Sequence, residues 1–170
     1  MAHIAVKDLS FTYPNSTKKA LDNINMEIEP GQFILVCGAS GCSKTTLLRH
    51  FKSVLTPHGK REGRIIFNNK ELFEIPEKEQ AEKIGFVFQS PEDQIVTDKV
   101  WHELAFSLES LNKPNDVIAL RSAETAGYFD LGNKYRSDVN TLSGGQKQLL
   151  NLASVMTVTP EVLILDEPTS

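Results

Sequence analysis

Gly38-Ala39-Ser40-Gly41-Cys42-Ser43-Lys44-Thr45-Thr46 is the stretch that decides the fold of this 170-residue chain. The run before it, residues 32–37, is apolar and β-prone and predicts a buried parallel strand. The residues after it recur at helical spacing: Leu47, Leu48, Phe51, Val54 and Leu55. A glycine-rich turn between a strand and a helix directs several backbone N–H groups at one point, where the helix dipole is positive. This turn is therefore expected to hold a phosphate group.

Two side chains in the turn strengthen that expectation and one weakens it. Lys44 is placed to reach β- and γ-phosphates, and the Thr45 hydroxyl to ligate Mg²⁺. The strict pattern, G-x-x-x-x-G-K-[ST], has glycine directly before the lysine, where this chain has Ser43. A Cβ there crowds the phosphate or strains a backbone angle that glycine tolerates. An ordinary strand-to-helix turn is the alternative interpretation.

Composition limits the class of protein. The chain is long enough for a real core, and its formal net charge of −4 comes from mixed charges without a basic patch, so no nucleic-acid partner is expected. Its apolar runs are too short to span a membrane, and the start lacks the pattern of a signal peptide. Cys37 and Cys42 are read as a buried small side chain and a reduced loop thiol, which favours the cytoplasm.

Alternating and continuous apolar runs predict the remaining strands. Residues 2–9 and 21–28 indicate an antiparallel N-terminal β-ribbon, and 63–67, 84–88 and 162–165 indicate further strands, the last two buried. A short helix is expected to start at Pro76. Tyr13, in the turn after the first strand, is either an exposed surface aromatic or a platform that stacks on a base. Spacing alone favours the first.

The middle of the chain is helical. Trp101, Leu104, Ala105, Leu108 and Leu111 share one helical face and predict core packing, and a weaker helical pattern runs to about Gly127. A further helix opens at Ser143, with Leu149, Leu152, Ala153 and Met156 expected on its buried face. The predicted organisation is a single α/β domain in which residues 1–89 and 158–170 form the core and 90–157 form a helical insert.

Polar residues follow two of the buried strands. Gln89 comes after the strand at 84–88, and Asp166 and Glu167 end the strand at 162–165. Ligands of open α/β sheets gather at the carboxyl ends of strands. One carboxylate there can hold Mg²⁺, and a neighbouring one can accept a proton from attacking water. The alternative is that the two acids only begin a solvated loop.

Leu142-Ser143-Gly144-Gly145-Gln146 is the remaining motif. Paired glycines in a first helical turn reduce helix stability and so need a reason. Either they form an extended capping turn, or they expose backbone N–H groups and the Ser143 hydroxyl to an anion.

The phosphate turn, Gln89, the 142–146 motif and Leu163-Ile164-Leu165-Asp166-Glu167-Pro168-Thr169-Ser170 occur in the order found in ATP-binding-cassette (ABC) ATPases, and the resemblance covers the whole chain. It implies a P-loop NTPase-like mixed core sheet with the N-terminal ribbon and the helical insert. The segment at 89–95, followed by Glu103-Leu104-Ala105-Phe106, resembles the energy-coupling-factor branch, whose members power import of vitamins or transition-metal ions.

The resemblance also implies roles. Glu167, Gln89 and Lys44 would be catalytic, Thr45, Gln89 and Asp166 would serve Mg²⁺, and Tyr13 would stack on adenine. ATP would further be bound by the phosphate turn and, from a second cassette, by the 143–146 motif: Gly38, Ser40, Gly41, Cys42, Ser43, Lys44, Thr45, Thr46, Ser143, Gly145 and Gln146.

The implied partners are a second ABC ATPase, in a head-to-tail homo- or heterodimer, and a transmembrane coupling subunit on the inner face of the membrane. Residues 90–103, with Glu92, Asp93 and Glu103, would receive that subunit. The resemblance also implies that the chain ends before the family's aspartate loop and switch histidine and lacks a central strand, so this form is expected to hydrolyse ATP poorly. A catalytically inactive nucleotide-binding or interaction subunit, and a soluble ABC protein outside transport, are the competing hypotheses.

Overall fold

The computed structural model describes residues 3–168, and the chain divides into two compact units, residues 1–80 and 81–170. The described residues do not include Met1, Ala2, Thr169 and Ser170. The first residue of the expected strand at 2–9 and the last two residues of the motif at 163–170 therefore lie outside them. The nested division into a core and a helical insert remains a prediction, and each unit is described by itself.

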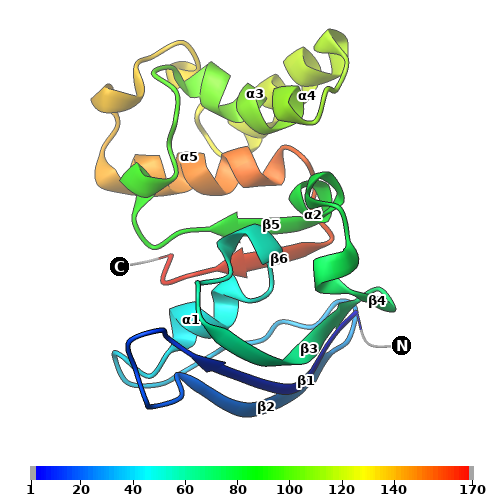
Figure 1. Cartoon of the computed structure of the whole chain (residues 1–170). Coiled ribbons are helices and arrows are strands. Elements are labelled where there is room, and N and C mark those ends of the chain that lie inside the picture. Colours follow the sequence, from blue (N-terminus) through cyan, green and yellow to red (C-terminus); the bar gives the residue numbers. More distant parts are fainter. Residues whose placement is uncertain (1–2, 169–170) are drawn as a thin grey trace. The chain divides into compact units, whose positions relative to one another are not determined.

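The first unit is built on an antiparallel sheet (Figure 1). Strand β1 (Ile4–Thr12) pairs on one side with β2 (Leu21–Ile28) and on the other with β3 (Lys60–Phe67). The short β4 (Lys70–Glu71) pairs antiparallel with the far side of β3. The expected N-terminal ribbon is therefore confirmed, and a third and a fourth strand extend it.

A bulge in β1 keeps its apolar residues on the buried face. The pairing with β3 shifts between Lys7 and Ser10, so Val6 and Leu9 both reach the core although they are three positions apart. Gly63 of β3 lies opposite this shift at φ +81°, and a Cβ there would lie 2.4 Å from the carbonyl oxygen of Asp8. Only glycine fits this close approach of two backbones.

The helix after the phosphate turn is shorter than its apolar spacing predicts. Helix α1 covers Lys44–Arg49, and a separate 3-10 turn covers Ser53–Leu55. Leu47 and Phe51 are buried as expected, whereas Val54 is 54% exposed. The helix ends at His50, whose backbone N–H bonds to Leu47 O instead of to the carbonyl four residues back.

The expected parallel strand at residues 32–37 is wrong. Within the described part of the chain no strand pairs with this segment, and Phe33 and Leu35 are 89% and 76% exposed. A parallel strand is stable when neighbouring strands pair with its backbone and other elements cover its faces. Neither condition is met here, so a strongly β-prone sequence stays in an irregular, solvent-facing conformation.

Helix α2 (Glu77–Lys83) starts after Pro76, as predicted, and runs across the boundary between the units. It follows a 3-10 turn at Leu72–Glu74. The buried Gln80 side chain donates to the carbonyls of Leu72 and Ile75 and accepts from the backbone N–H of Ser53. This one amide thereby satisfies three backbone groups of the first unit.

The second unit contains a parallel pair of strands, β5 (Ile84–Val87) and β6 (Val162–Leu165), at the expected positions. All four residues of β5 are buried, but Leu163 of β6 is 39% exposed, so the prediction that this strand is buried holds only in part. Helix α5 (Gly144–Met156) packs on β5 (Figure 1). Gly85 permits this approach, since a Cβ there would lie 2.5 Å from Cγ1 of Val155.

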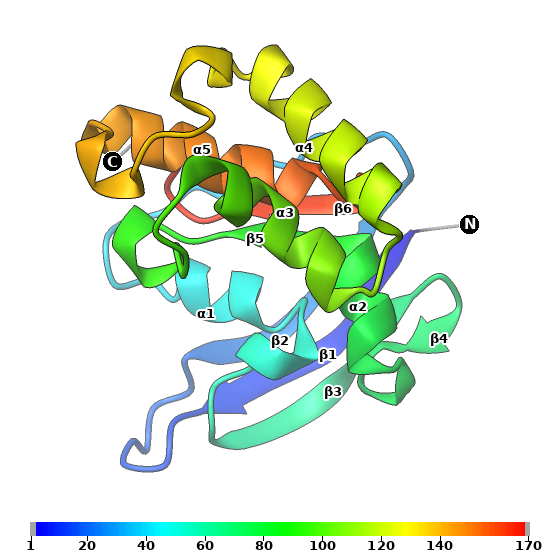
Figure 2. The same ribbon diagram turned by 90° about the horizontal axis from the view of Figure 1, so that it is seen from above.

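Three helices form the rest of the second unit: α3 (Val100–Ser110) packs against both α4 (Asn115–Tyr128) and α5 (Figure 2). Short 3-10 turns at Pro91–Asp93, Gly132–Lys134 and Val139–Thr141 connect them. Their shared core consists of Val100, Leu104, Ala126, Leu131, Val139, Leu142, Leu150 and Ala153.

Two details of these helices differ from the prediction. Trp101 is 41% exposed and stacks on His102, although the remaining members of its predicted stripe are buried. On α5 the buried residues are Leu150, Asn151, Ala153 and Ser154, whereas Leu149, Leu152 and Met156 are only half-buried. The apolar spacing predicted the helix correctly but not which of its faces is buried, because the polar Asn151 and Ser154 lie on the buried face.

Candidate functional site

The phosphate turn curls around its own lysine. Lys44, the first residue of α1, donates from Nζ to the carbonyls of Gly38 at 3.0 Å and Ala39 at 3.1 Å. Gly41 has φ +77°, which the tight turn requires, and the Cys42 N–H bonds to Ala39 O. The ammonium group therefore lies in the concave side of the loop, where an anion would meet it.

Ser43, which replaces the glycine of the strict pattern, has the strained backbone angle that a glycine would tolerate. Its φ and ψ are +72° and +24°, in the left-handed region, and it is the N-cap residue of α1. Its side chain makes no capping hydrogen bond. A serine here carries the energetic penalty of a left-handed backbone without the usual benefit of a serine cap.

The two cysteines are free thiols and both are exposed. The expectation of unpaired thiols holds, but the prediction that Cys37 is buried is wrong, because residues 32–37 do not form a covered strand. A Cβ on Gly38 would lie 2.6 Å from the sulfur of Cys42, so that sulfur fills the space beside Gly38.

Tyr13 is tied to the phosphate turn. Its hydroxyl lies 3.0 Å from Oγ1 of Thr46 in α1, and its ring makes an edge contact with Phe11 at 4.9 Å between centroids. The side chain is nevertheless 40% exposed. An aromatic side chain that is anchored through its hydroxyl and still partly exposed can serve as a stacking platform, whereas an ordinary surface aromatic needs no such anchor.

In the second unit, Gln89 and the acidic pair meet. Gln89 follows β5, Asp166 and Glu167 follow β6, and the Gln89 amide donates to Oε2 of Glu167 at 2.9 Å. Asp166 is only 3% exposed, and its backbone N–H extends the sheet by bonding to Val87 O. Glu167 has φ +48°, a left-handed conformation that turns the chain directly after the strand.

The residues expected to serve Mg²⁺ offer a suitable set of donor atoms. Thr45 supplies a hydroxyl, Gln89 an amide oxygen and the buried Asp166 a carboxylate. Oxygen atoms, at least one of them anionic, are the ligands that Mg²⁺ prefers. Thr45 belongs to the first unit, and Gln89 and Asp166 belong to the second.

The 142–146 motif forms a complete capping box. Ser143 Oγ accepts from the Gln146 N–H at 3.3 Å, and Oε1 of Gln146 accepts from the Ser143 N–H at 3.0 Å. The capping-turn interpretation is therefore confirmed. Gly144 and Gly145 have open space around the position of a Cβ, so their surface is accessible from outside, and the anion-binding interpretation remains a prediction.

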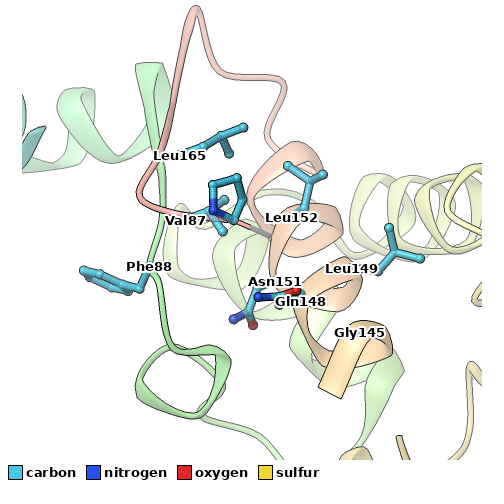
Figure 3. A pocket seen from close by; sticks show the side chains of 9 residues that line it. Val87, Phe88, Gly145, Gln148, Leu149, Asn151, Leu152 and Leu165 are labelled. Atoms are coloured by element: carbon cyan, nitrogen blue, oxygen red, sulfur yellow. The ribbon is translucent and has the colours of Figure 1, made fainter. Parts of the chain in front are cut away.

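A hollow of about 190 Å³ lies beside this helix within the second unit. It is lined by Val87, Phe88, Gly145, Gln148, Leu149, Asn151, Leu152, Leu165 and Pro168 (Figure 3). Asn151 is fully buried, and its Nδ2 donates to Pro91 O while its Oδ1 has no hydrogen-bond partner in the described structure. The hollow thus connects the first turn of α5 with the ends of β5 and β6.

The segment after Gln89 is held to α5. Besides the Asn151 contact, Lys147 pairs with Glu92 at 3.1 Å, and this hydrogen-bonded ion pair lowers the pKa of Glu92. Glu103, which was expected on the partner-binding surface, is instead 3% exposed: its Oε2 accepts from the N–H groups of Val96 and Thr97 and from the Thr97 hydroxyl. This carboxylate stabilises the loop and is not presented to a partner.

Sequence patterns missed one buried group near the phosphate turn. His50 carries no predicted role, yet it is fully buried and its Nδ1 lies 2.7 Å from Thr46 O. Burial lowers the pKa of His50, and the nearby Arg61 charge lowers it further, against the opposing effect of the Thr46 hydrogen bond. A polar residue four positions after Thr46 on an apolar helix face was the available signal.

Comparison with known proteins identifies the class. Residues 21–170 match the ABC transporter family, and the chain therefore belongs to that family. Its mixed α/β fold is that of an ABC ATPase.

Individual relatives are named as ATP-binding proteins of ABC transporters, in agreement with the family match. Over its full length the chain is 46% identical to a putative ABC transporter ATP-binding protein of Bacillus anthracis, of which it covers 31%, and a similar protein of Methanosarcina mazei is 37% identical, with 29% covered. The chain thus spans about a third of the length of the curated relatives it matches. Among the described residues, no helix combines the length and apolar character needed to cross a membrane.

Two solved structures superpose on nearly the whole chain, each with a TM-score of 0.83. One is CbiO1 of Clostridium perfringens, described as part of the ABC transporter complex CbiONQ; it is 32% identical, and the match covers 99% of this chain and 66% of CbiO1. The other is a dimeric ATP-binding cassette in a post-hydrolysis state with ADP and phosphate; it is 25% identical, with 98% and 74% covered.

Proposed function

We propose that this chain binds and hydrolyses ATP to power an ABC importer of the energy-coupling-factor class, which takes up a vitamin or a transition-metal ion. The observation that carries the proposal is the Gln89–Glu167 hydrogen bond, which joins an amide and a carboxylate at the ends of two parallel strands. Family membership and the likeness to a component of CbiONQ support the transport role.

The first unit supplies nucleotide contacts. Lys44 and the N–H groups of the loop at 38–46 bind the phosphates, and the exposed ring of Tyr13 stacks on adenine. Ser43 weakens this binding because its left-handed backbone is strained and its Cβ takes up space beside the phosphate.

The second unit supplies the general base and the amide that orients it. The Glu167 carboxylate accepts a proton from the attacking water, and Gln89 orients that carboxylate through their hydrogen bond. Thr45, Gln89 and Asp166 would hold Mg²⁺, which when bound neutralises charge on the phosphates. Ser143, Gly145 and Gln146 contact the γ-phosphate of ATP held by a second ABC ATPase, so the working unit is a head-to-tail dimer.

The proposed partners are those that the family resemblance implies. Residues around Glu92 and Asp93 receive a transmembrane subunit at the inner face of the cell membrane. The likeness to a dimeric cassette with ADP and phosphate supports the dimer, and the membership of CbiO1 in the ABC transporter complex CbiONQ supports a transporter subunit as partner.

The test is calorimetric titration with MgATP together with phosphate-release measurements on the chain and on Ser43→Gly. Saturable ATP binding that Lys44→Ala abolishes, with turnover that rises in Ser43→Gly, is the expected result. Binding without turnover in both forms would instead support the inactive nucleotide-binding subunit, which the strained Ser43 favours. Absence of binding even in Ser43→Gly would refute the proposal.

A further inference from the structure

Four residues in the first unit form a closed ring of contacts between β1 and the segment of α1 and its C-cap. The Tyr13 hydroxyl bonds to the Thr46 hydroxyl, the Thr46 carbonyl bonds to Nδ1 of His50, and the rings of His50 and Tyr13 both contact Phe11. Phe11 and His50 are 1% and 0% exposed, so the ring of contacts is anchored in the core. It joins the candidate base platform to the helix that carries the phosphate turn.

The His50 hydrogen bond has a defined chemistry. A carbonyl oxygen can only accept, so Nδ1 must carry the proton. The Thr46 carbonyl would bond to the His50 N–H in a continuing helix, but that N–H bonds to Leu47 O. The imidazole therefore caps a carbonyl left over at the end of α1, as histidines near helix C-termini can.

The second nitrogen of the ring shows that this arrangement has a cost. Nε2 is buried and has no hydrogen-bond partner among the described residues. An unsatisfied buried polar atom is unfavourable, and a plain apolar side chain would avoid that penalty. The benefit that offsets it is the bond from Nδ1, which fixes Thr46 and, through its hydroxyl, the orientation of Tyr13.

We propose that His50 is a positioning residue for nucleotide-base recognition: through Thr46 and Phe11 it fixes the Tyr13 ring relative to the phosphate turn. His50 contacts no nucleotide itself. This inference rests on the proposed function, because it assumes that Tyr13 stacks on adenine while the turn binds the phosphates. It predicts that loss of the His50 hydrogen bond weakens recognition of the base and leaves recognition of the phosphates intact.

Two ligands separate these contributions: ATP, and inorganic tripolyphosphate, which has the phosphates without the base. His50→Phe keeps an aromatic ring against Phe11 but has no donor for Thr46. The dissociation constant of ATP is expected to rise about threefold to tenfold, the effect of one lost hydrogen bond, while that of tripolyphosphate changes by less than about twofold.

Two further variants test the route of the effect. His50→Asn presents an amide N–H to the Thr46 carbonyl and is expected to restore most of the ATP affinity. In a Tyr13→Phe background, which lacks the hydroxyl bonded to Thr46, His50→Phe is expected to cause little further loss. An equal loss for both ligands, or a full extra loss in the Tyr13→Phe background, overturns the inference.

Failure of the proposed function has a different signature, since the unmodified chain would then bind neither ligand. Circular dichroism and thermal melting establish that each variant is folded. If His50→Phe does not fold, Phe11→Leu serves as the second variant, because it removes both ring contacts. An unchanged ratio of ATP to tripolyphosphate affinity in folded Phe11→Leu would then overturn the inference.

Discussion

The side-chain amide of Gln89 donates to Oε2 of Glu167 at 2.9 Å, although the two residues are 78 positions apart in the sequence. Val87 and Leu165, which precede them, are register partners in the parallel pair of β5 and β6. The carboxylate is thus oriented by a neighbouring strand. If Glu167 is the general base, as proposed, this hydrogen bond holds it aligned without a rearrangement of its own chain.

Replacement of Glu167 with glutamine is expected to lower ATP turnover by about 100-fold or more, the range for loss of a general base. ATP affinity should change by less than about threefold, because the amide keeps the shape of the carboxylate and can still bond to Gln89. Phosphate release and calorimetry measure the two quantities, in both the parent and the Ser43→Gly background.

Glu161→Gln is the matched control, since Glu161 is an exposed carboxylate of the same unit, paired with Lys83 at 3.5 Å. It should leave turnover unchanged. Equal losses in the two variants would remove the special role assigned to Glu167.

Replacement of Ser43 with glycine is expected to stabilise the protein by about 0.5–1 kcal/mol, because glycine adopts the left-handed conformation at φ +72° without a Cβ penalty. No capping hydrogen bond is lost in exchange. Chemical denaturation monitored by circular dichroism measures the change in the free energy of unfolding.

Ser40→Gly makes the same chemical change three residues earlier, at a position without a positive φ. It should be neutral or mildly destabilising, because glycine increases the entropy of the unfolded chain. If both substitutions stabilise equally, backbone strain at Ser43 is not the cause.

The sequence predicted local features of this structure well. β2 has the predicted bounds, and the capping turn, one of the two interpretations of the 142–146 motif, is present as a Ser143–Gln146 capping box. Gln89 and Glu167 were expected at strand ends, and the parallel pairing of β5 and β6 brings them into contact. Short-range periodicity and turn chemistry encode such features.

Features that depend on distant partners were not predictable in the same way. Residues 32–37 have an apolar, β-prone sequence, but their conformation depends on which strands pair with them. Glu103 has a charged side chain, yet three donors from Val96 and Thr97 make its burial favourable. His50 likewise acquires its role from Phe11 on a strand far earlier in the chain.

Gly85→Ala is expected to destabilise the second unit by about 1–3 kcal/mol, the range for overpacking a dense core. The new Cβ would lie 2.5 Å from Cγ1 of Val155 on α5 and 3.0 Å from Cγ of Pro160. Helix α5, which carries Ser143 at its start, would have to move away from β5. Denaturant titration provides the measurement.

Gly127→Ala supplies the control with the opposite sign. This glycine lies within α4, nothing is within 4 Å of its Cβ position, and alanine is the better helix former. A gain of about 0.5–1 kcal/mol is expected. Similar losses at both positions would contradict the close packing inferred at Gly85.

Acid is expected to destabilise the first unit through His50. Burial holds the pKa of His50 in the folded protein below its ordinary value of about 6.5, and the Arg61 charge acts in the same direction. Above pH 6.5 the imidazole is neutral in both states and makes no pH-dependent contribution. As the pH falls below that value the unfolded state takes up a proton first, so the free energy of unfolding decreases, by at most about 1.4 kcal/mol per pH unit, until the folded pKa is reached.

His50→Phe has no group to titrate, and the difference in unfolding free energy between the parent and this variant should therefore vary with pH only below about 6.5. Denaturation at a series of pH values between 5 and 8 yields that difference, with carboxylates common to both proteins cancelling. A difference that stays constant throughout would show that the buried imidazole is not the group responsible.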